Sequence, residues 1–189
     1  MKKRTPVQAR PSAPGPVSLD PRPPVPGTQH LWAPWRIRYV QSTHQPTACF
    51  LCAMLKAPRT HDRKNLLLVR GKTCLVCLNR YPYNGGHLMV APRRHVAELA
   101  ALRPAEHAEM MQLATRMVAV LGQAMHPHGF NIGMNLGHAA GAGLRDHIHM
   151  HVVPRWVGDV NFMPVFADIK VIPQALEELY DQLAAELRK

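Results

Sequence analysis

Three histidines alternate with apolar residues in the stretch His147-Ile148-His149-Met150-His151-Val152-Val153. Alternation with a period of two residues is typical of a β-strand that has one polar face and one buried face. We expect the three imidazoles on one face, each roughly 6.6 Å from the next, and the apolar residues between them in a core. A face of three titratable rings is costly to bury. We therefore interpret it as a chemical site and not as a solvated strand face.

Two kinds of chemistry fit such a face. Imidazole is a common metal ligand, and it is also a nucleophile in covalent catalysis. The upstream residues favour the second role, because small residues dominate the loop Gly133-Met134-Asn135-Leu136-Gly137-His138-Ala139-Ala140-Gly141-Ala142-Gly143. Glycines let backbone N–H groups approach a ligand closely, as phosphate sites require. We therefore predict a phosphate-binding site beside the histidine strand.

The spacing of the three histidines resembles the signature of the histidine triad (HIT) family of nucleotide hydrolases and transferases. The likeness extends to residues 78–95 and, beyond the triad, to residues 154–163. The second of these segments and Trp32-Ala33-Pro34-Trp35-Arg36 are similar to a bacterial branch that contains diadenosine tetraphosphate phosphorylases. The likeness runs from Leu31 to the C-terminus.

Hairpin-like strands and two helices predict an α+β fold, with an antiparallel sheet and helices to one side. The resemblance implies the five-stranded antiparallel sheet and two main helices of the HIT-like fold. The apolar patterns predict strands at residues 65–70, 73–78, 87–91, 130–135 and 147–153, and helices at residues 104–125 and 173–187. The first helix carries an apolar stripe at spacings of three and four that should face the core: Met110, Leu113, Met117, Leu121 and Ala124.

The chain of 189 residues is long enough for one domain with its own core. Residues 1–28 hold eight prolines and few large apolar groups, which is typical of a disordered or polyproline-like tail. We expect residues 29–189 to form the HIT domain. No apolar run approaches the roughly 18 residues of a membrane span. The basic start leads into prolines and not into an apolar segment, so we expect no signal peptide and a reducing cytoplasm for the four cysteines.

The net charge of +11 is spread along the chain, and residues 1–31 contribute +4 of it. A basic body attracts polyphosphate substrates. The charge could equally reflect contact with nucleic acid, although the charges outside the tail are scattered and not clustered, which makes that partner the less favoured one. We expect a small nucleotide as the substrate and no membrane contact. The resemblance implies a homodimer.

Cys49-Phe50-Leu51-Cys52 is a C-x-x-C pair, which alone is ambiguous between a zinc half-site and a redox pair. Some HIT proteins bind a structural zinc with such a pair, the histidine of a Pro-x-x-His turn and the first triad histidine. The resemblance therefore implies a tetrahedral Cys₂His₂ set: Cys49, Cys52, His95 and His147. The alternative is two buried thiols, with His95 as a helix-capping or surface group.

Other cysteines and histidines are expected to be structural. Cys74 and Cys77 also have C-x-x-C spacing, but they lie within a predicted strand, where residues three apart face opposite sides. We expect core thiols there and not ligands. Three histidines belong to no motif and are expected at the surface: His107, His126 and His128.

The resemblance assigns His149 the role of the nucleophile, which attacks the α-phosphorus of a nucleoside polyphosphate and forms a nucleotidyl-histidine. His147 and His151 flank it and would contact phosphate oxygens or orient its ring. Among the substrate-binding residues, the resemblance places Asn79 by the ribose, and it implies that Asn135 helps to hold the phosphates or to orient the site. Backbone N–H groups around three loop residues would bind the developing charge: Gly141, Gly143 and Leu144. From the resemblance we expect that the chemistry itself requires no cofactor.

The acceptor that resolves the intermediate decides the reaction. Inorganic phosphate gives ADP and ATP from diadenosine tetraphosphate, whereas water gives AMP and ATP. The resemblance of residues 32–36 and 154–163 to the phosphorylase branch favours phosphorolysis. Hydrolysis of dinucleoside polyphosphates or nucleoside phosphoramidates is the alternative, although residues 142–146 offer no hydroxyl or amide side chain to assist a phosphoramidate.

Two hypotheses of other classes remain open at this stage. One is a zinc-stabilised module that binds nucleotides or RNA without turnover. An intact triad argues against it, because binding alone does not need a central imidazole free for attack. The other is a metal-dependent enzyme in which all three triad histidines are ligands.

Overall fold

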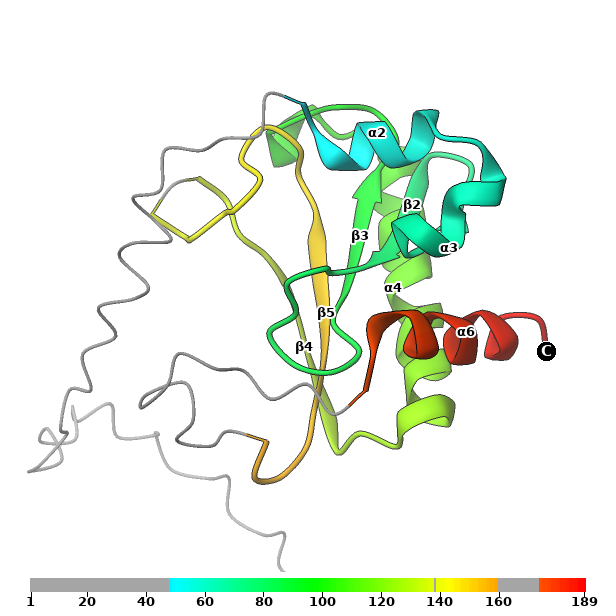
Figure 1. The fold of residues 1–189 in the computed structure, drawn as a ribbon. Coiled ribbons are helices and arrows are strands. Elements are labelled where there is room, and N and C mark those ends of the chain that lie inside the picture. Colours follow the sequence, from blue (N-terminus) through cyan, green and yellow to red (C-terminus); the bar gives the residue numbers. More distant parts are fainter. Residues whose placement is uncertain (1–47, 138, 160–173) are drawn as a thin grey trace, which may run out of the picture. The chain divides into compact units, whose positions relative to one another are not determined.

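The computed structural model describes residues 48–137, 139–159 and 174–189. Its centre is a five-stranded antiparallel sheet with the strand order β1-β2-β3-β5-β4 (Figure 1). The strands are β1 (Leu67–Arg70), β2 (Cys74–Leu78), β3 (Leu88–Pro92), β4 (Gly129–Met134) and β5 (Met150–Arg155). The predicted α+β fold with this sheet is confirmed. The expected tail at residues 1–28 and the Trp32–Arg36 segment lie outside the described residues.

Two helices cover one face of the sheet. Helix α4 (Pro104–Met125) spans the predicted residues and packs against α6 (Leu176–Glu186). Pro104 suits the first helical position because its missing N–H would have no partner there. The carboxylate of Glu106 accepts the N–H of Arg103 at 2.8 Å and so supports the same first turn. The predicted stripe faces the core, with four members buried and Ala124 partly buried: Met110, Leu113, Met117 and Leu121.

The opposite face carries a smaller core under α2 (Phe50–Lys56). Its buried residues are Leu51, Leu67, Leu75, Cys77, Met89 and Ala91. Cys74 belongs to the core under α4 instead, so the two thiols of the second C-x-x-C face opposite sides of β2, as predicted. Burial raises the pKa of Cys74 to about 11 and that of Cys77 to about 12, so both stay protonated.

Helices α2 and α3 (Asp62–Asn65) were not predicted, and they displace the expected start of β1 from residue 65 to Leu67. Arg70 of β1 holds α2 in place. Its guanidinium donates to the carbonyl oxygens of Met54, Leu55 and Ala57 at 2.9 to 3.0 Å, and it pairs with Asp62 at 2.6 Å. A helix leaves its last carbonyl groups without intrahelical partners, so this cation satisfies the end of α2.

The ladder of the triad strand begins at Met150, three residues later than expected. Val90 of β3 pairs with Met150, so Pro92 would lie opposite Ile148. Pro92 has no N–H to donate, and the ladder ends before it. The N–H of Ile148 donates instead to the oxygen of Val96 at 2.7 Å. The chain stays extended enough for Ile148, Met150 and Val152 to enter the same core.

Within the described residues, no helix has the length and apolar content needed to cross a membrane.

Candidate functional site

The three triad histidines lie on the sheet face opposite the α4 core, and all three are buried. His149 and His151 are only 7% and 9% exposed, and their rings meet edge to face with centroids 4.8 Å apart. Met89 pairs with His151, which places both side chains on this face. The face is called the triad face below. It combines three imidazoles with a small cluster of apolar side chains that includes Met89.

The surroundings of His149 fix the position of its proton. Its Nδ1 lies 2.9 Å from the backbone oxygen of His147. A carbonyl oxygen can only accept, so Nδ1 donates and the lone pair is on Nε2. Burial lowers the pKa of His149 and favours the neutral ring. A neutral imidazole with a free lone pair is the state that nucleophilic attack requires.

His147 is held in the opposite sense. Its Nε2 lies 2.8 Å from the oxygen of Pro92 and therefore donates. Its Nδ1 lone pair faces the Sγ atoms of Cys49 at 3.2 Å and Cys52 at 3.6 Å. Both ring nitrogens are thus engaged, and the expected contact of His147 with a phosphate oxygen has no support from this geometry. The ring belongs to the group of cysteines around it.

Four side chains offer a set of metal ligands: Cys49, Cys52, His95 and His147. Their ligand atoms all lie within 4.8 Å of one another, and Cys52 Sγ is 3.4 Å from His95 Nδ1. This set is called the Cys/His group below. The start of α2 supplies the two thiols, the turn after β3 supplies His95, and the segment before β5 supplies His147. The structure thus brings together all four residues that the sequence analysis proposed, and they can hold a metal ion.

The structure describes the expected phosphate-binding residues, and it gives contacts for only some of them. Met134 of β4 pairs with Met150 at the end of the ladder, and the same register continued by one residue would place Asn135 opposite His149. Leu144 packs on the apolar cluster of the triad face. Gly137 and Gly141 adopt positive φ of 76° and 77°, a left-handed backbone that glycine tolerates. The backbone thus turns sharply at these two glycines, and the phosphate contacts of the loop remain a prediction.

Asn79 follows β2, as expected, and its amide organises the next loop. Its Oδ1 accepts the N–H of Tyr81 at 2.9 Å, and its Nδ2 lies 3.3 Å from Nδ1 of His87. The proposed ribose contact remains a prediction. Asn84 closes the same loop, donating from Nδ2 to Asp159 at 2.8 Å. A hydrogen bond from Arg155 holds the pKa of Asp159 at about 2, so the carboxylate stays charged.

His87 is a site residue that the sequence analysis missed. It is fully buried, and its Nε2 lies 2.9 Å from Nδ1 of His151. The ring of Tyr83 packs against both, with centroids 4.5 Å from His87 and 5.5 Å from His151. The sequence held one signal for this residue. Alternation along the predicted strand places His87 on the same face as Met89, two residues further on.

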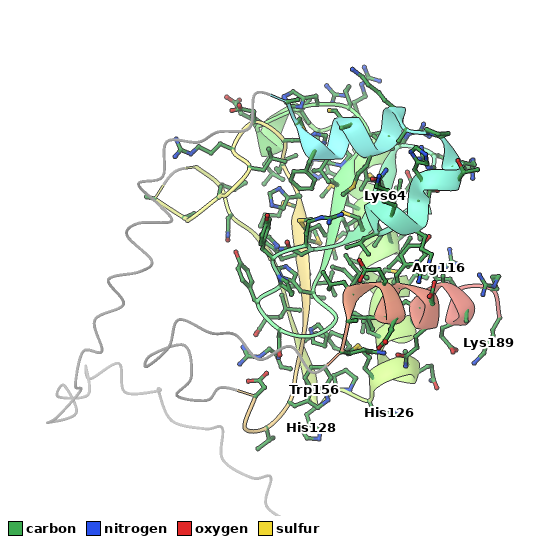
Figure 2. The ribbon with its side chains drawn as sticks, viewed as in Figure 1. Lys64, Arg116, His126, His128, Trp156 and Lys189 are labelled. Atoms are coloured by element: carbon green, nitrogen blue, oxygen red, sulfur yellow. The ribbon has the colours of Figure 1, made fainter. Side chains whose placement is uncertain are left out.

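The histidines without a motif stay outside the site. His107, His126 and His128 are exposed, as expected. Figure 2 shows His126, His128 and Trp156 toward the end of the sheet that lies opposite α2. The N–H of Val157 donates to Nδ1 of His128 at 2.9 Å, which fixes that ring at the surface.

An α+β fold with a five-stranded sheet and a buried row of three histidines is typical of a histidine triad protein. Residues 61–157 match the HIT domain model. The AP-4-A phosphorylase of Mycobacterium tuberculosis is 42% identical over 163 residues, which cover 84% of each chain. An adenosine 5′-monophosphoramidase of Schizosaccharomyces pombe is 21% identical over 75% of this chain and 99% of that protein. This chain belongs to the HIT domain family, as the triad predicted.

A solved structure supports the same assignment. The crystal structure of a Zn-bound histidine triad family protein from Mycobacterium smegmatis matches with a TM-score of 0.58 and 28% identity. The match covers 75% of this chain and 94% of that chain.

Proposed function

We propose that this enzyme splits dinucleoside polyphosphates by phosphorolysis, converting diadenosine tetraphosphate and inorganic phosphate into ADP and ATP. The observation that carries the proposal is the tautomer of His149, whose Nδ1 is committed to the oxygen of His147 and whose Nε2 is free to attack. The name of the Mycobacterium tuberculosis relative, AP-4-A phosphorylase, supports both the substrate and the acceptor.

In the first step, Nε2 of His149 attacks the α-phosphorus. The N–P bond forms while the bond from this phosphorus to the bridging oxygen breaks, and ATP leaves with the oxygen and its electron pair. His151 is neutral at pH 7, because burial and the neighbouring His149 lower its pKa to about 4. A neutral imidazole can stabilise the developing negative charge by donating a hydrogen bond.

In the second step, an oxygen of inorganic phosphate attacks the same phosphorus and the N–P bond breaks. The product is ADP, and His149 returns to its neutral state. Water in place of phosphate would give AMP. Asn135, which the continued register of β4 with β5 would place opposite His149, and backbone N–H groups of the loop at Gly141, Gly143 and Leu144 would hold the phosphate oxygens. We assign Asn79 to the nucleoside side.

The test is incubation of the purified protein with diadenosine tetraphosphate, with and without inorganic phosphate, and separation of the products by ion-exchange chromatography. ADP and ATP that appear only with phosphate support the proposal. AMP and ATP in both reactions make the enzyme a hydrolase instead. Tight binding without product favours a binding module, and a parallel reaction with an adenosine phosphoramidate tests the activity named for the Schizosaccharomyces pombe relative.

We also propose that the Cys/His group holds a structural zinc. Zn–S bonds of about 2.3 Å and Zn–N bonds of about 2.0 Å in a tetrahedron place neighbouring ligand atoms roughly 3.3 to 3.8 Å apart. The distances of 3.2, 3.4 and 3.6 Å between the sulfur and nitrogen atoms fit this requirement. The carbonyl of Pro92, which accepts from His147 Nε2, is a typical outer-shell partner of a metal-bound histidine. The ion would fix the fold around His147 and takes no part in the reaction.

The homodimer is a further proposal. Strand β4 is at the edge of the sheet, where its outer N–H and C=O groups can pair with another strand. Ile132 pairs with Val152 and so points to the side of the α4 core, yet it remains 47% exposed. A second copy of the chain at this edge would cover it.

A further inference from the structure

The loop before β3 directs two donors at one atom of His87. The N–H of Tyr83 donates to His87 Nδ1 at 3.0 Å. The side chain of Asn79 lies 3.3 Å from the same nitrogen. Because the Oδ1 of Asn79 accepts from Tyr81, the atom that faces His87 is its NH₂ group. His87 Nδ1 is therefore an acceptor and carries no proton.

This arrangement fixes the positions of the ring protons of His87 and His151. A neutral imidazole with an acceptor at Nδ1 has its proton on Nε2. His87 Nε2 lies 2.9 Å from Nδ1 of His151, so it donates to that atom. His151 must then carry its own proton on Nε2. The chain of hydrogen bonds thus runs from the N–H of Tyr83 through His87 to His151, and it leaves the Nε2–H of His151 as the last donor.

We propose that His87 is a positioning residue that holds His151 as the Nε2–H tautomer, ready to donate a hydrogen bond to the substrate. This proposal rests on the function proposed above. The same contact keeps His151 from accepting a second proton at Nδ1, because a donor already occupies that side. The groups that face His151 are His87 and Tyr83 from the loop and start of β3, and His149 from its own segment.

The burial of His87 strengthens the assignment. An unpaired polar group in a buried position is costly, and both nitrogens of His87 have a partner in this arrangement. The aromatic ring of Tyr83 covers both imidazoles from one side. If His87 served only as filler, a purely apolar side chain of similar volume would fit the site better.

Two variants of similar size separate the alternatives. His87→Gln keeps a side-chain N–H that can reach His151, whereas His87→Met fills the space without a donor. We expect His87→Met to lower kcat at least about tenfold with little change in KM, and His87→Gln to restore most of the loss. The acid limb of the pH profile should move to higher pH in His87→Met only, because Nδ1 of His151 then accepts a proton more easily.

Nitrogen-15 NMR of histidine-labelled protein reads the tautomer without turnover. The wild type and His87→Gln should show His151 with its proton on Nε2, and His87→Met should show a mixture of tautomers. A proton on Nδ1 of wild-type His151 would overturn the proposal before any variant is made. So would a His87→Met protein that keeps the wild-type tautomer, or an equal loss of kcat in both variants. A wild type that shows the expected tautomer but does not cleave dinucleoside polyphosphates refutes the proposed function and leaves the tautomer assignment standing.

Discussion

The Nδ1 atom of His149 lies 2.9 Å from the backbone oxygen of His147. The ring of His147 belongs to the Cys/His group, through contacts of its Nδ1 with Cys49 and Cys52. His147 therefore contributes to two groups: its carbonyl oxygen fixes the tautomer of His149, the proposed nucleophile, and its imidazole could serve as a metal ligand. If His149 is the nucleophile, as proposed, its position depends on how well the Cys/His group holds His147 in place.

Replacement of His149 by alanine should lower turnover by about a thousandfold or more, because no other imidazole among the described residues can take its place as the nucleophile. The measurement is the initial rate of diadenosine tetraphosphate cleavage at saturating substrate. A radiolabelled nucleotidyl-enzyme should form on the wild type and not on the variant. His107→Ala, at an exposed position of α4, is the matched control and should retain full activity. An active His149→Ala protein would refute the nucleophile role.

The purified protein should contain one zinc ion per chain, measured by plasma mass spectrometry after purification without chelators. Cys52→Ser should lose the ion, and its melting temperature should fall by at least about 10 °C because metal binding contributes to folding. Turnover should fall by about tenfold, because loss of the ion would let His147 move and would weaken the contact of its carbonyl oxygen with Nδ1 of His149. Cys74→Ala removes a thiol from the core under α4 and should keep the zinc. Zinc-free wild-type protein would contradict the assignment.

The sequence patterns predicted those features of the structure that depend on a single segment of the chain. Helix α4 could be predicted to the residue, because Pro104 marks its start and the apolar stripe has a single period. The triad face followed from alternation, and the opposite orientation of Cys74 and Cys77 followed from the pleat of β2. These are local regularities that each segment carries within itself.

Contacts between residues that are far apart in the sequence could not be predicted from the pattern of one segment. The hydrogen bond from His87 to His151 joins residues 64 positions apart and depends on the register of β3 with β5. The late start of β5 depends on Pro92, a residue of another strand. Helix α3 has only four residues, too few for a periodic pattern. The Cys/His group was assembled through a resemblance, since spacing alone did not choose among its ligands.

The edge of β4 should carry the homodimer contact. Ile132→Arg places a charge on the edge strand and should shift the protein from about 42 kDa to the 21.1 kDa monomer. The measurement is light scattering coupled to gel filtration. Val157→Arg, at a position that is 89% exposed, is the control and should remain dimeric. A monomeric wild type would remove the dimer proposal.

Deletion of residues 1–28 should change turnover by less than about tenfold, since the proline-rich composition of this segment gives it little apolar area to bury. The comparison is kcat and KM of the full chain and of a chain that starts at Gln29. A larger loss would mean that the tail belongs to the functional domain.

The stability of the fold should fall as the pH drops from 7 toward 4. The pKa of His151 is lowered from 6.5 to about 4 by burial and by the neighbouring His149. Between these two values the unfolded chain binds more protons than the folded one, so the free energy of unfolding rises with pH. The contribution of His151 is fully present above its unfolded pKa and is lost as the pH falls through the window. Glu106 and Asp159, with pKa values of about 2, act below this window.

His151→Asn isolates this effect. Its Oδ1 can replace Nδ1 as the acceptor for His87, but the side chain does not titrate. Between pH 7.5 and pH 5.0 the free energy of unfolding should fall by about 2 kcal/mol more in the wild type than in the variant. Urea unfolding followed by circular dichroism at the two pH values measures the difference. The residues of the Cys/His group are the same in both proteins, so their titration cancels in the comparison. Equal losses in the two proteins would show that His151 titrates as it does in the unfolded chain.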